Sequence, residues 1–83
     1  GNVSYRIPGI HPLIGIAPAD VALHTRAFAE AAASPAAESG AIDGAAGLAL
    51  TALDYLCDPE LRRAVADEFA AAGGPVDVAR YFD

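Results

Sequence analysis

Two histidines are the side chains of this sequence best suited to chemistry. A neutral imidazole can bind a divalent metal or transfer a proton near neutral pH. His24 follows the apolar segment Val21–Leu23 and precedes a helix-forming stretch. Ligands of α/β sheets bind at such positions, just beyond the carboxyl ends of strands. His11 lies near the start of another apolar segment, where a histidine can face a substrate or simply end a strand. His24 is the stronger candidate for a metal ligand.

The residue pattern does not complete a metal site around either histidine. Such sites need three or four convergent ligands, and the chain has no HxH, HExxH or CxxC pattern. Asp20 can orient a histidine as an outer carboxylate or cap a loop. The single Cys57 permits no internal disulfide, and its position is typical of a small buried apolar residue. On the residues alone, a histidine that bonds a carbonyl or faces water is the commoner arrangement.

Apolar periodicity predicts two strands that would carry these histidines. Residues 3–7 alternate between apolar and polar side chains, which is the pattern of a half-buried strand. Residues 10–16 are almost continuously apolar, as in a strand covered on both faces. Because Pro12 cannot donate to a ladder, the regular strand should start after it. Two strands leave open edges, so we expect them to join a larger sheet.

Three helices are predicted after the strands. Their expected ranges are 26–33, about 41–57, and about 59–72, with Ser34-Pro35 as an interruption and Asp58-Pro59 as a cap and first helical position. Gly44 and Gly47 suggest that a neighbouring segment approaches the long helix closely. The resulting fold class is α/β, in one partial domain: residues 1–25 as strands bordering a site, 26–74 as a helical cover, and 75–83 as a strand or docked tail.

Composition limits the function classes. The 83 residues carry a net charge of −6, with five arginines and no lysine, which argues against nucleic acid or anionic lipid as partners. No apolar run approaches the roughly 20 residues of a membrane span. A lone cysteine fits a reducing cytoplasm. The absence of methionine suggests a cleaved fragment or a domain excised from a longer protein.

Three motifs, in this order, carry a resemblance to a known family. They are GNVSYRIPGIHPLIGI, then LHTRAFAEAA, then LALTALDYLCDPELRRAVADEF, within residues 1–69. Together they resemble the C-terminal end of the metal-dependent amidohydrolases and peptidases of the aminoacylase and carboxypeptidase-G superfamily. The most similar branch contains aminobenzoyl-glutamate hydrolase and its dipeptidase relatives. The set of motifs is fairly specific, although no single motif would be.

The resemblance implies a role for several residues. Members hydrolyse amide bonds of N-acyl amino acids, dipeptides or aminobenzoyl-glutamate-like conjugates, at a two-metal site that usually holds zinc or manganese. His24 in LHTRAF matches a histidine that is a metal ligand. His11, Asn2 and Ser4 match positions that border the cleft, so they are candidates for substrate binding. The expected partners are the remainder of the catalytic domain and a second copy of the parent protein, as a cytoplasmic homodimer.

The sequence also departs from the family pattern. The upstream histidine, the bridging aspartate, the general-base glutamate and the other acidic ligands have no counterpart here, and a two-metal hydrolase needs them. We therefore expect an enzyme in the parent protein, no catalytic residue within these 83 residues, and no activity from them alone. Two alternatives stay open: a noncatalytic helical interaction module, and a truncated pseudo-enzyme.

The 83 residues are predicted to be only partly ordered in isolation. Large apolar side chains are few, and much of the 54% apolar fraction is alanine, which buries little area. Heating the purified chain should give a broad, shallow loss of circular dichroism. A sharp cooperative transition of the monomer would contradict this prediction.

Overall fold

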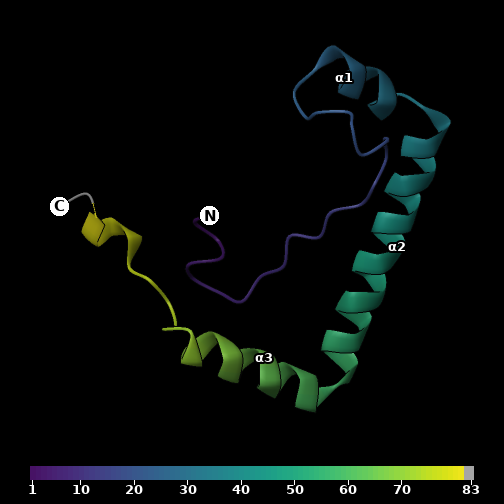
Figure 1. Ribbon diagram of the computed structural model, residues 1–83. Coiled ribbons are helices and arrows are strands. Elements are labelled where there is room, and N and C mark those ends of the chain that lie inside the picture. Colours follow the sequence, from purple (N-terminus) through teal and green to yellow (C-terminus); the bar gives the residue numbers. More distant parts are fainter. Residues whose placement is uncertain (82–83) are drawn as a thin grey trace. The chain divides into compact units, whose positions relative to one another are not determined.

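Residues 1–81 are described by the structure, a computed structural model, and their regular secondary structure is helical. The elements are α1 (Arg26–Ala32), α2 (Pro35–Cys57), α3 (Pro59–Ala71) and the 3-10 helix η1 (Val78–Tyr81) (Figure 1). Within this part of the chain there is no strand and no sheet, so the predicted α/β class is wrong. The last two residues of the predicted tail, 82 and 83, lie outside the described residues. No helix between residues 1 and 81 has the length and apolar character needed to cross a membrane.

The first predicted strand is a helical turn. The Tyr5 N–H donates to the Gly1 carbonyl at 3.2 Å, and the Ile7 N–H donates to the Val3 carbonyl at 3.1 Å. These are bonds between residues four apart, as in an α-helix. The alternation over residues 3–7 was therefore misleading, because the backbone satisfies its hydrogen bonds locally and no neighbouring strand is available within the described chain.

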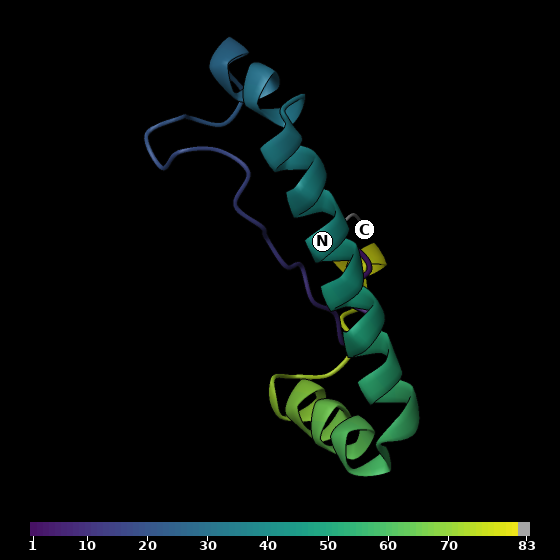
Figure 2. The same ribbon diagram turned by 90° about the vertical axis from the view of Figure 1, so that its right-hand side faces the viewer.

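The second predicted strand, residues 10–16, is an irregular segment that runs alongside α2 (Figure 2). Leu13 is 91% exposed, so the segment is not covered on both faces as expected. Residues 21–23 are also not a strand, since the Val21 N–H closes a turn by donating to the Pro18 carbonyl at 3.0 Å. Pro12 and Pro18 each remove a backbone donor, which disfavours regular pairing in this region.

The helix predictions were more accurate. The bounds of α1 and α3 agree with expectation, and the Asp58 carboxylate caps α3 by accepting from the N–H groups of Glu60 and Leu61. The long helix, however, begins at Pro35 and not near Ala41. Ser34 and Pro35 start this helix, because the Ser34 hydroxyl accepts from the Ala37 N–H at 3.2 Å and proline suits the first helical position.

The chain divides into two compact units. One comprises Gly1–His11 and Ala52–Asp83, and the other comprises Pro12–Thr51, so the boundary falls within α2. In the first unit, the tail is attached to the N-terminal turn by the Val76 N–H, which donates to the Tyr5 carbonyl at 2.7 Å. The described part of the tail contains η1 and no strand, so the strand alternative is wrong.

The corner between α2 and α3 is held by an arginine of the first unit. The Arg62 guanidinium donates to the carbonyls of Tyr55 and Leu56, at 2.9 and 2.7 Å. Carbonyls in the last turn of a helix have no partner inside that helix, and a cation near them is favourable. Arg62 is a residue of α3, and its side chain caps the C-terminal end of α2.

The second unit packs its irregular segment against glycines of α2. A Cβ atom built on Gly40 would lie 2.9 Å from Ile16 Cγ2, and one on Gly44 would lie 3.8 Å from Ile14 Cγ2. Ile14 and Ile16 are two residues apart, which is about 6.6 Å in an extended segment. Gly40 and Gly44 are four residues apart, which is about 6 Å along a helix, so the two pairs come into register. Ala37, one turn before Gly40, is 6% exposed and is the buried apolar residue of the described chain.

Substitution of the α2 glycines by alanine should separate packing from helix propensity. Gly47→Ala should stabilise α2 by about 1 kcal/mol, because nothing lies within 4 Å of the added methyl group. Gly40→Ala should destabilise the unit by about 1–3 kcal/mol, since Ile16 must move. Hydrogen exchange of the α2 amides measures both effects. Equal protection in the two variants would show that the segment does not rest on Gly40.

Removal of the α3 cap should weaken that helix. Asp58→Ala should cost about 1 kcal/mol, or roughly fivefold faster exchange of the first α3 amides, because two N–H groups lose their acceptor. Asp54→Ala is the matched control. Its carboxylate lies near the C-terminus of α2, where a negative charge is unfavourable, so exchange should be unchanged or slower. Faster exchange in both variants would argue against capping as the cause.

Candidate functional site

His24 occupies a turn with an uncommon backbone conformation. Its φ of 61° lies in the left-handed region, which non-glycine residues seldom adopt. The residue is exposed and immediately precedes Thr25, the N-cap of α1. A strained, exposed histidine is compatible with a ligand role, because strain of this kind gathers at functional sites.

Thr25 fixes the turn that carries His24. Its hydroxyl donates to the Ala22 carbonyl at 2.7 Å and accepts from the Phe28 N–H at 3.2 Å. The Thr25 side chain therefore closes the turn that precedes it, which contains His24, and caps the helix that follows it. The backbone of His24 is held from both directions by local bonds.

The described residues do not form a whole metal site. Among residues 1–81 there is no group of three or more histidine, cysteine, aspartate or glutamate side chains able to hold a metal ion. A zinc site needs at least three protein ligands. Any site that uses His24 must therefore take most of its ligands from other residues.

The other predicted site residues lie in the first unit, whereas His24 lies in the second. Asn2 and Ser4 share the N-terminal turn, and both are exposed. The Ser4 hydroxyl donates to the Gly1 carbonyl at 2.9 Å, so what it still offers a substrate is its acceptor capacity. His11 is exposed and precedes Pro12, outside any helix.

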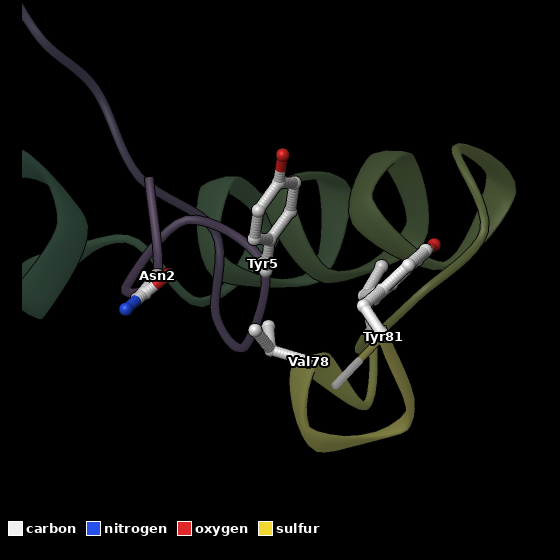
Figure 3. A pocket seen from close by; sticks show the side chains of 5 residues that line it. Asn2, Tyr5, Val78 and Tyr81 are labelled. Atoms are coloured by element: carbon white, nitrogen blue, oxygen red, sulfur yellow. The ribbon is translucent and has the colours of Figure 1, made fainter. Parts of the chain in front are cut away.

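An open hollow of about 300 Å³ adjoins the N-terminal turn. Asn2 and Tyr5 line it from the turn, and Val76, Val78 and Tyr81 line it from the tail (Figure 3). Asn2 is thus the predicted site residue that the structure places at a hollow. The tyrosines and valines were not singled out from the sequence, because their pairing depends on a bond between Val76 and Tyr5 that joins residues far apart in the chain.

Comparison with known proteins found two similar sequences. The chain is 45% identical over 69 residues to a mouse protein named Xaa-Arg dipeptidase, and 41% identical over the same length to its human counterpart. The chain resembles dipeptidases. The aligned residues make up 83% of this chain but only 16% of each relative, so the chain spans about one sixth of their length.

Two other comparisons gave no match. No family model matches the sequence. No solved structure matches it either. The similarity to the two dipeptidases agrees with the superfamily indicated by the sequence motifs, and at this coverage it supports that superfamily loosely. The assignment of individual residues rests on the motifs.

One residue with a clear structural role was missed from the sequence. Thr25 was not singled out from the sequence. The available signal was its residue type, since threonine directly before a helix is a common N-cap. Its second bond, to Ala22, has no comparable signature in the sequence because it depends on the conformation of the turn.

Proposed function

We propose that these 83 residues are part of a metal-dependent hydrolase of peptide or related amide bonds. The observation that carries the proposal is the similarity to the two Xaa-Arg dipeptidases, at 41–45% identity. Identity of this degree over 69 residues, together with the three ordered motifs, favours a shared function of the whole proteins. Dipeptides are accordingly the first substrate class to test, ahead of N-acyl amino acids and aminobenzoyl-glutamate-like conjugates.

His24 is the proposed metal ligand. It matches the ligand histidine of the family motif, is exposed, and sits on a turn fixed by local hydrogen bonds. The metal, zinc or manganese, would take its remaining ligands from residues outside this chain. Its chemistry when bound is activation of a water molecule and polarisation of the amide carbonyl.

The residues of the first unit are proposed to contact the substrate. Asn2 offers an amide with both donors and acceptors, Ser4 an acceptor oxygen, and His11 an imidazole. All three are exposed and lie in one compact unit. Binding groups of this kind orient a dipeptide without taking part in bond cleavage.

The remainder of a catalytic domain is the proposed partner of this chain. Large apolar side chains are exposed on every part of it, among them Leu13, Leu23 and Leu56, the last 72% exposed. Solvent exposure of such side chains is unfavourable, and a covering domain would remove them from water. The parent enzyme is proposed to be a cytoplasmic homodimer, as in the family that the motifs resemble.

A noncatalytic helical module is the competing proposal. It is favoured by one observation, that the regular secondary structure of residues 1–81 is helical. Such a module would have no need of a histidine in a left-handed conformation. The two proposals differ in what they predict for the metal.

Substitution of His24 should test the proposal in the full-length protein that contains this chain. His24→Ala should lower the affinity for zinc or manganese by at least tenfold, because one ligand of the metal is lost. It should also abolish hydrolysis of Xaa-Arg dipeptides. His11→Ala is the matched control on the second histidine. It should leave the metal affinity unchanged and raise KM, as expected for loss of a substrate contact.

Metal content and steady-state kinetics give the answer together. Unchanged metal affinity and rate in the His24 variant would favour the helical module. Loss of metal in both histidine variants would mean that His11 is not a substrate contact.

A further inference from the structure

We draw no further inference here: the strongest candidate, the exposed apolar stripe that Ile42, Leu53 and Leu56 form along one face of α2, is an unpartnered helix face, and nothing in the described residues 1–81 shows what covers it.

Discussion

The close approach of Ile16 to Gly40 is the contact on which the second unit depends. A helix rich in alanine has little apolar surface of its own to bury, so stability must come from what packs on it. Glycine at position 40 lets an isoleucine methyl group come nearer than a Cβ atom would allow. Ile14 repeats the contact one helical turn later, at Gly44. These contacts place the irregular segment around Ile14 and Ile16 along α2.

The helices could be predicted from the sequence, and the strands could not. Caps act within a few residues, so Asp58-Pro59 marked the start of α3 correctly. Ser34-Pro35 was misjudged as an interruption, although a serine cap followed by proline is a helix start. Apolar alternation at residues 3–7 and the apolar run at 10–16 indicate that side chains pack against something. They do not indicate which segment is the packing partner. Among the described residues, the first segment contacts the tail at Val76, and the second contacts α2.

The candidate site shows the same division. Residue type singled out His24 and His11 as candidates, because imidazole binds metals and transfers protons, and the family resemblance added Asn2 and Ser4. Conformation was out of reach: neither the left-handed backbone of His24 nor the bond from Thr25 to Ala22 has a sequence signature. The glycine expectation was half correct, since Gly44 is approached by Ile14 while Gly47 has nothing within 4 Å.

The corner formed by Arg62 has a consequence for the choice between arginine and lysine at this position. Both bonds, to the carbonyls of Tyr55 and Leu56, leave from one nitrogen, Nη1, which carries two hydrogens in the guanidinium plane. A lysine ammonium is a point charge on a flexible stem and does not hold its donors in a fixed plane. The bend between the two helices therefore depends on the planar shape of this side chain as well as on its charge.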